Sequence, residues 1–198
     1  MALHPEKTLC DGSVWPGSGL ALVLRAAILA ATLVVSPASR ALDGVSVAGA
    51  NGNGTDVARL GAQWNWQKSW PAAGGWNITG FWDALIGHWH GRESIAQNRN
   101  IVELGGGPVF RLSPGSSSSV LPFLEYGIGV RLLSRTRINR DREFSTAFQF
   151  ASHLGAGIRF GSDRRYDLMF RFQHISNGSI KKPNDGINLS EVRLAYHF

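Results

Sequence analysis

Cysteine is almost missing from this 198-residue chain, which contains only Cys10. That residue precedes the most apolar run of the sequence and lies in a segment that we expect to be removed. A mature chain without cysteine cannot be a disulfide scaffold or a thiol enzyme, and it cannot hold a metal ion through thiolates. Cys10 is also misplaced for a lipid anchor, because it comes before the apolar run instead of after it.

Long apolar runs are missing as well. The run at 26–35 has ten residues, whereas a membrane-spanning helix needs about 20. Arg25 precedes this run and small residues follow it, which is the arrangement of a secretory signal cleaved after Ala41. We therefore predict a signal peptide at 1–41. Its charged region is long, so we expect the true translation start to lie downstream of Met1.

Acidic side chains are the scarcer charged group, with 14 Asp and Glu against 20 Lys and Arg. Cleavage after Ala41 leaves 17 basic and 12 acidic residues, a net charge of +5, because it removes Lys7, Arg25, Arg40, Glu6 and Asp11. An exported basic protein is more suited to anionic lipid or glycolipid than to nucleic acid. We predict lipid partners and no nucleic-acid partner.

Alternation of apolar and polar residues dominates the mature sequence. It occurs in eight segments separated by Gly, Ser, Asn and Pro clusters: 44–50, 58–67, 76–86, 102–112, 124–132, 144–160, 166–173 and 191–198. A period of two is typical of a β-strand with two different faces. Residues 42–198 are therefore predicted to form one domain of eight strands, with one large apolar row and one row of glycines and charges.

Two all-β architectures accommodate this pattern, a soluble barrel of the lipocalin type and an outer-membrane barrel. An eight-stranded lumen is just wide enough for side chains, and glycines could fill it together with a paired charge set: Asp83, Glu103, Glu125, Arg111, Arg131, Arg159 and Arg171. The apolar row would then face lipid, with girdle candidates Trp64, Trp66, Trp76, Tyr126, Tyr166 and Tyr196. The terminal Phe198 resembles the C-terminal signature of bacterial outer-membrane proteins. We predict an eight-stranded antiparallel transmembrane β-barrel, with a soluble periplasmic lipid-binding barrel as the alternative.

Strand parity singles out one polar pair. With both termini in the periplasm, the extracellular connections lie near 50–56, 91–99, 134–143 and 177–187, and the periplasmic ones near 68–75, 113–121 and 161–165. His174 and Ser176 then lie at the extracellular end of a strand, on the face of Phe170 and Phe172, which points at lipid. A polar pair is unfavourable there without a function, and histidine beside serine is the pair that activates a hydroxyl nucleophile.

Several motifs around this pair resemble the outer-membrane lipid A 3-O-deacylase family. The segments are HISN at 174–177, PNDGI at 183–187, WNWQKSW at 64–70, GFWDA at 80–84 and PFLEYGIGV at 122–130. The resemblance implies an eight-stranded barrel in the bacterial outer membrane, with its active site facing the outer leaflet. It also implies hydrolysis of the acyl ester at position 3 of lipid A, without a metal or an organic cofactor.

The resemblance also implies roles for particular residues. Ser176 would attack the ester carbonyl, and His174 would accept and return its proton. Asn177 and Asn184 match positions that shape the site and could bind the oxyanion. The family's triad acid, where present, follows the DGI run, and this chain has Asn188 there. Asparagine can still hold the tautomer of a histidine, so we expect Asn188 to orient His174.

Two further hypotheses remain open. Glu191 is the nearest downstream carboxylate and the alternative triad acid, although its place in the alternation predicts a side chain that points into the lumen. Lys181 and Lys182 flank the site and are candidate contacts for the phosphates of the substrate. A non-enzymatic small barrel that serves adhesion or surface structure is the alternative function.

Overall fold

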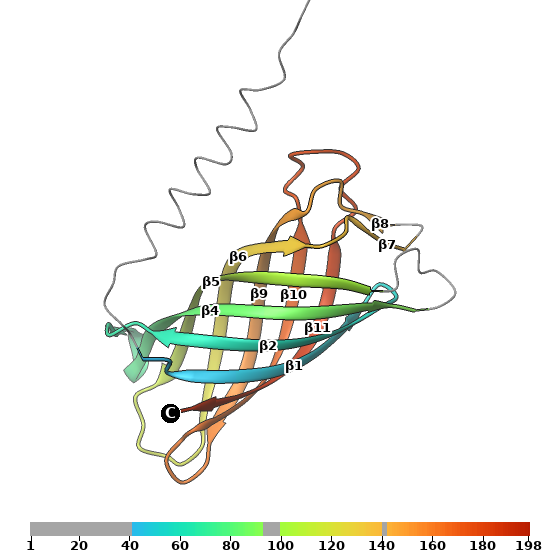
Figure 1. Ribbon diagram of the computed structural model, residues 1–198. Helices are drawn as coiled ribbons and strands as arrows, with labels where there is room; N and C mark the ends of the chain where they lie inside the picture. The colour runs from blue at the N-terminus through green and yellow to red at the C-terminus, as the bar shows by residue number, and fades with distance from the viewer. Residues whose placement is uncertain (1–40, 93–99, 140–141) are drawn as a thin grey trace, which may run out of the picture. The chain divides into compact units, whose positions relative to one another are not determined.

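The computed structural model describes residues 41–92, 100–139 and 142–198. Within these ranges, eight long antiparallel strands form one sheet (Figure 1): β1 (Gly44–Gly52), β2 (Thr55–Asn65), β4 (Trp76–Gly91), β5 (Asn100–Pro114), β6 (Leu121–Leu133), β9 (Phe148–Phe160), β10 (Tyr166–Ser176) and β11 (Ile187–His197). The order along the sheet is β2-β1-β11-β10-β9-β6-β5-β4, and β2 also pairs with β4. The sheet is therefore closed, and the predicted eight-stranded antiparallel barrel is confirmed.

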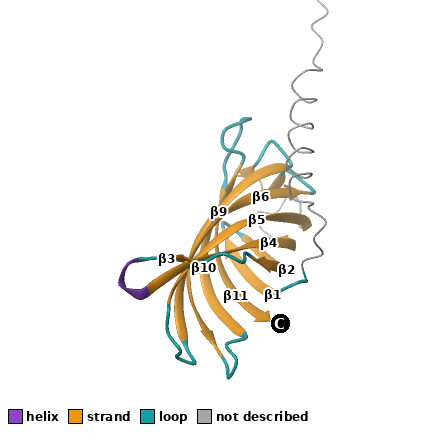
Figure 2. Ribbon diagram, turned by 90° about the vertical axis from the view of Figure 1, so that its left-hand side faces the viewer, coloured by secondary structure: helices purple, strands orange, loops and turns teal. Residues whose placement is uncertain are grey.

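The remaining elements are short. In the chain, β2 is followed by a strand β3 (Trp70–Pro71), which pairs with β4, and by a 3₁₀ turn η1 (Ala73–Gly75), drawn in purple in Figure 2. A small hairpin of β7 (Arg137–Asn139) and β8 (Arg142–Glu143) lies between β6 and β9. No helix in the described ranges is long and apolar enough to cross a bilayer. The predicted signal peptide falls outside these ranges except for Ala41 and stays a prediction.

The two rows of each strand separate as the alternation predicts. On β10, Phe170 and Phe172 are each 53% exposed on the outside of the barrel. The residues between and beside them, Met169, Arg171 and Gln173, point inward and are at most 3% exposed. Long exposed apolar side chains recur on the other strands, which is the surface expected where the surrounding solvent is lipid.

A network of ion pairs fills much of the lumen. Glu125 pairs with Arg111 at 2.5 Å and with Arg171 at 2.9 Å. Other buried pairs include Arg59–Glu103, Arg59–Glu191, Arg131–Glu103, Arg193–Asp83, Arg111–Asp167 and Arg171–Glu191. Burying charges is tolerable only when they are paired. Each of these charges has a partner of opposite sign, although one guanidinium nitrogen each of Arg131, Arg171 and Arg193 has no hydrogen-bond acceptor among the described residues. The lumen charges predicted from the sequence are present and paired.

One end of the lumen is apolar, which the sequence pattern did not predict. We call the end that carries the β10–β11 connection the outer end, and the opposite end the inner end. Buried apolar side chains fill the outer end: Ala50, Val57, Trp89, Ile101, Leu133, Ile138, Phe144, Ala151, Ile175, Ile187 and Leu189. The Trp89 indole donates to Glu103 at 2.7 Å and joins this plug to the ion-pair network. The plug supports the strand ends from within.

Aromatic rings gather on the outer face near the inner end. Trp66 packs edge-on against Trp70, Trp82 and Phe110, with centroid separations of 5.1–6.2 Å. Gly80 lies beneath it, and a Cβ there would lie 2.2 Å from the Trp66 ring. Such aromatic belts lie at the interfaces between lipid and water in membrane barrels.

Candidate active site

The outer end of β10 carries the predicted pair. His174 is exposed and Ser176 is half-buried, and both lie on the outer face in the row of Phe170 and Phe172. Ile175, between them, is fully buried in the plug. The packing of Ile175 inside the barrel therefore fixes the outward direction of its two polar neighbours.

His174 has a partner on the next strand. In the register of β10 and β11 it lies directly opposite Asn188, and its Nδ1 lies 2.7 Å from the Asn188 Oδ1. An amide oxygen can only accept, so Nδ1 is the donor in this bond, and in a neutral imidazole Nε2 then keeps its lone pair. A neutral histidine in that tautomer is ready to accept a proton from a hydroxyl group.

Glu191 lies on the other side of the sheet. It is 3% exposed, and its carboxylate binds Arg59 at 2.5 Å and Arg171 at 3.6 Å within the lumen. It is therefore part of the ion-pair network and does not share a face with His174. Asn188 occupies the place beside the histidine that sequence parity predicts.

A residue that sequence reasoning missed supports Asn188 from the β1–β2 hairpin. The Asn188 backbone N–H donates to the Asn53 Oδ1 at 3.1 Å. Asn53 and Gly54 have φ values of 47° and 72°, the left-handed conformation that a two-residue hairpin turn requires and that Asn-Gly favours. The Asn-Gly turn was readable in the sequence, but its contact with a strand more than 130 residues away was not.

The loop between β10 and β11 is ordered from inside by Asn177. This side chain is fully buried, and its Nδ2 donates to the carbonyls of Phe144 at 2.6 Å and Lys181 at 2.8 Å. Its backbone N–H donates to the Asn184 Oδ1 at 3.0 Å. Within the described part of the chain, the Asn184 amide nitrogen is left without an acceptor. Of the two asparagines, Asn184 therefore keeps side-chain donors for a ligand.

The same loop is held from outside by the neighbouring connection. The Arg142 guanidinium donates to the Gly186 carbonyl at 2.7 Å, and the Glu143 backbone N–H donates to the Asp185 carboxylate at 2.7 Å. Ser145 donates its hydroxyl to the Pro183 carbonyl at 2.6 Å. We call residues 142–145 the clasp. No local sequence pattern indicates it, because it joins two connections that are distant in the chain.

Gly186 brings the clasped loop against the polar pair. Its φ is 57°, a conformation that favours glycine. A Cβ at this position would lie 3.2 Å from the His174 Cε1 and 3.4 Å from the Ser176 Cβ. The loop backbone is therefore in contact with both side chains, and there is little space for a larger residue.

A shallow apolar groove of about 450 Å³ begins at this pair and runs over the outer face. Its walls come from β5, β6, β9 and β10: Pro108, Ile128, Gly129, Val130, Phe150, Ala151, Ser152, His174 and Ser176. The β5–β6 ladder is interrupted at Gly107 and Pro108, and glycines let the strands approach closely there. The Gly-Gly-Gly-Pro run at 105–108 was the signal in the sequence that could have indicated it.

The two lysines lie at the outer edge of the site. Lys181 and Lys182 are exposed in the loop, next to Ile180, which is 67% exposed. Among the described residues, no group of three His, Cys, Asp or Glu side chains is arranged to hold a metal ion.

Known proteins resemble the chain over most of the barrel. Residues 56–197 match the family model described as lipid A 3-O-deacylase (PagL). Lipid A deacylase PagL of Pseudomonas aeruginosa is 37% identical over 166 residues, which cover 83% of this chain and 92% of that protein. Lipid A deacylase PagL of Bordetella bronchiseptica is 34% identical over 91 residues, 46% of this chain and 47% of that protein.

A solved structure agrees with these sequence matches. The crystal structure of the outer membrane enzyme PagL matches with a TM-score of 0.68 at 30% identity, covering 78% of this chain and 99% of that one. The apolar outer wall is therefore that of an outer-membrane barrel, and the predicted localisation is confirmed. The chain belongs to the lipid A 3-O-deacylase (PagL) family.

Proposed function

We propose that this protein is a lipid A 3-O-deacylase that hydrolyses the ester-linked acyl chain at position 3 of lipid A in the outer leaflet. Membership of the family supports the substrate and the reaction. The observation that carries the mechanism is the His174–Asn188 hydrogen bond on the lipid-facing wall, two residues from Ser176. A site on that wall can act on a lipid that stays in the membrane.

Ser176 is the nucleophile of the proposed reaction. Its Oγ attacks the ester carbonyl while the His174 Nε2 takes the hydroxyl proton. The tetrahedral intermediate collapses with cleavage of the bond to the sugar oxygen, and His174 returns the proton to that alkoxide. A water molecule, deprotonated by His174, then attacks the acyl-serine, and the proton passes back to Ser176 as the fatty acid leaves.

Asn188 acts through the histidine. Its amide oxygen accepts the Nδ1 proton at 2.7 Å and keeps the ring in the tautomer that the reaction needs. It carries no charge, so it stabilises the imidazolium of the transition state less than a carboxylate does. Asn188 is therefore a positioning residue in our proposal, and Glu191 belongs to the barrel.

The oxyanion is stabilised by the loop. Asn184 provides the side-chain donor, because the side-chain donors of Asn177 are already bound to two carbonyls. Preorganised donors of this kind are effective because they need no rearrangement during the reaction. The clasp supplies that preorganisation by fixing Pro183, Asp185 and Gly186.

The remaining features orient the lipid. The apolar groove that ends at His174 and Ser176 accepts the acyl chain whose ester is cleaved. Lys181 and Lys182 lie at the headgroup end of the site, where they approach the phosphates of lipid A. Each exposed charge contact is modest in free energy, so the lysines improve binding without taking part in the chemistry.

The test is the lipid A profile of cells that express the protein. Wild type is expected to remove the 3-linked chain and leave the rest of lipid A intact, whereas Ser176→Ala and His174→Asn are expected to leave all chains in place. Ser190→Ala is the matched control, because Ser190 lies opposite Phe172 on the neighbouring strand and outside the groove. Lipid A from cells that express each of the four proteins is analysed by mass spectrometry. Unchanged lipid A with wild type would instead favour a non-enzymatic barrel.

A further inference from the structure

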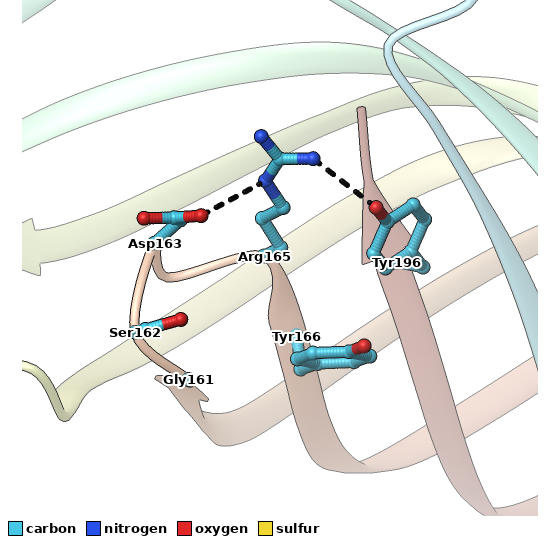
Figure 3. Close-up of a pocket in the computed structure, with 6 residues that line it drawn as sticks. All are labelled: Gly161, Ser162, Asp163, Arg165, Tyr166 and Tyr196. Carbon is cyan, nitrogen blue, oxygen red and sulfur yellow. Dashed lines mark hydrogen bonds and ion pairs between the residues drawn. The ribbon is translucent and has the colours of Figure 1, made fainter.

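A second pocket lies at the inner end of the barrel, where β9 turns into β10 (Figure 3). It measures about 280 Å³ and is lined by Gly161, Ser162, Asp163, Arg165, Tyr166 and Tyr196. It shares no residue with the groove beside Ser176, which lies at the other end of β10. The proposed deacylase reaction therefore does not use it.

The pocket combines both signs of charge with hydroxyl groups. As Figure 3 shows, the Arg165 side chain lies between Asp163, at 3.6 Å, and the Tyr196 hydroxyl, at 3.2 Å. Arg165 is 48% exposed and Asp163 is 69% exposed. A guanidinium has five N–H donors, and these two contacts leave several of them for a ligand. The Tyr196 oxygen accepts from Arg165, so its own proton can be donated outward.

The pocket lies at the border of the lipid-facing wall. Tyr166 stacks on Phe160 and contacts Tyr196, which packs edge-on against Phe198. The next residue of the outward row on β10 is Leu168, which is 43% exposed. Aromatic rings beside an apolar belt mark the depth at which lipid headgroups begin. With the inner end in the periplasm, as we predict from the sequence, the lipid next to the pocket belongs to the inner leaflet.

We propose that this pocket binds the headgroup of a zwitterionic, primary-amine glycerophospholipid of the inner leaflet. Arg165 and the Tyr196 hydroxyl bind the phosphate, for which a planar guanidinium is well suited. Asp163 binds the ammonium group at the other end of the headgroup. The tyrosine rings pack against the glycerol and the first methylene groups. Opposite charges on one short turn match a zwitterion better than they match a purely anionic headgroup.

Native mass spectrometry of the mature protein in detergent tests this proposal. The probes are phosphatidylethanolamine and phosphatidylglycerol with identical acyl chains, added separately over a range of concentrations. Wild type is expected to bind phosphatidylethanolamine more tightly. Arg165→Gln should weaken both lipids about three- to fivefold, the effect of losing one partly exposed charge contact. Asp163→Asn should weaken only phosphatidylethanolamine and abolish the preference.

Arg164→Gln is the matched control. It removes the same charge one residue away, but the Arg164 guanidinium binds the Ser116 carbonyl and does not line the pocket. It should leave both affinities as in wild type. Equal losses in Arg164→Gln and Arg165→Gln would mean non-specific charge attraction and would overturn the proposal. An unchanged lipid preference in Asp163→Asn would show that Asp163 does not bind the ammonium group, and it would also overturn the proposal.

Discussion

Replacing Asn188 is the change that separates our account of the histidine from the alternative one. The Asn188→Ala variant loses the 2.7 Å bond to His174 Nδ1. A neutral hydrogen bond contributes about 0.5–1.5 kcal/mol, so kcat should fall by about two- to thirteenfold through the lost tautomer preference. The bond from the Asn188 backbone to Asn53 does not involve the side chain, so the barrel should keep its stability.

The Asn188→Glu variant should change kcat in the opposite direction. A carboxylate at the same place would accept the Nδ1 proton and also stabilise the imidazolium, and charge-assisted bonds are about twice as strong as neutral ones. The kcat of Asn188→Glu should therefore equal or exceed that of wild type. Glu191→Gln should leave kcat largely unchanged but weaken the barrel by roughly 3 kcal/mol, because it removes one partner of the buried Arg59.

The assay is release of fatty acid from lipid A in detergent micelles, with folding followed by heat modifiability in gel electrophoresis. Values of kcat and KM are compared for wild type, Asn188→Ala, Asn188→Glu and Glu191→Gln. The reasoning is refuted if Glu191→Gln abolishes turnover in a folded barrel while Asn188→Ala does not. Glu191 would then be the acid, despite its position in the lumen.

Three other predictions follow from the loop. Arg142→Ala should lower kcat more than it raises KM, because the Gly186 carbonyl loses its donor, and Arg142→Lys should restore part of the lost kcat. Equal kcat values for wild type and both variants would show that the clasp does not contribute to catalysis. Asn184→Ala should lower kcat in a stable barrel. Asn177→Ala should lower thermal stability as well, because the carbonyls of Phe144 and Lys181 lose their donor; kcat and melting temperature are measured for both variants. Lys181→Ala combined with Lys182→Ala should raise KM for phosphorylated lipid A more than for a dephosphorylated form, and equal effects on both substrates would exclude a phosphate contact.

Local patterns were sufficient to predict much of this fold. Period-two alternation identified the eight strands, and it also assigned Arg171 to the lumen and Phe172 to the outer wall, as the structure shows. The same parity placed Asn188 on the face of His174 and Glu191 inside. These predictions succeeded because the two faces of a strand follow directly from sequence spacing.

Contacts between distant segments could not be predicted in this way. The clasp joins Arg142 to Gly186, and the hairpin residue Asn53 reaches Asn188 across the closure of the barrel. Both depend on which connections become neighbours once the sheet has closed. The apolar plug could not be predicted for another reason. Ile175, Ile187 and Leu189 continue the inward row, whereas the alternation in the sequence predicted a row of glycines and charges.

Release of one identified acyl chain by the purified protein tests the central claim most directly. The substrate is a defined lipid A whose 3-linked chain differs in length from all the others, and the released fatty acid is identified by mass spectrometry. We predict that wild type releases only the 3-linked chain and that Ser176→Ala, folded and at the same concentration, releases none. Release of a chain from another position, or undiminished release by Ser176→Ala, would contradict the account.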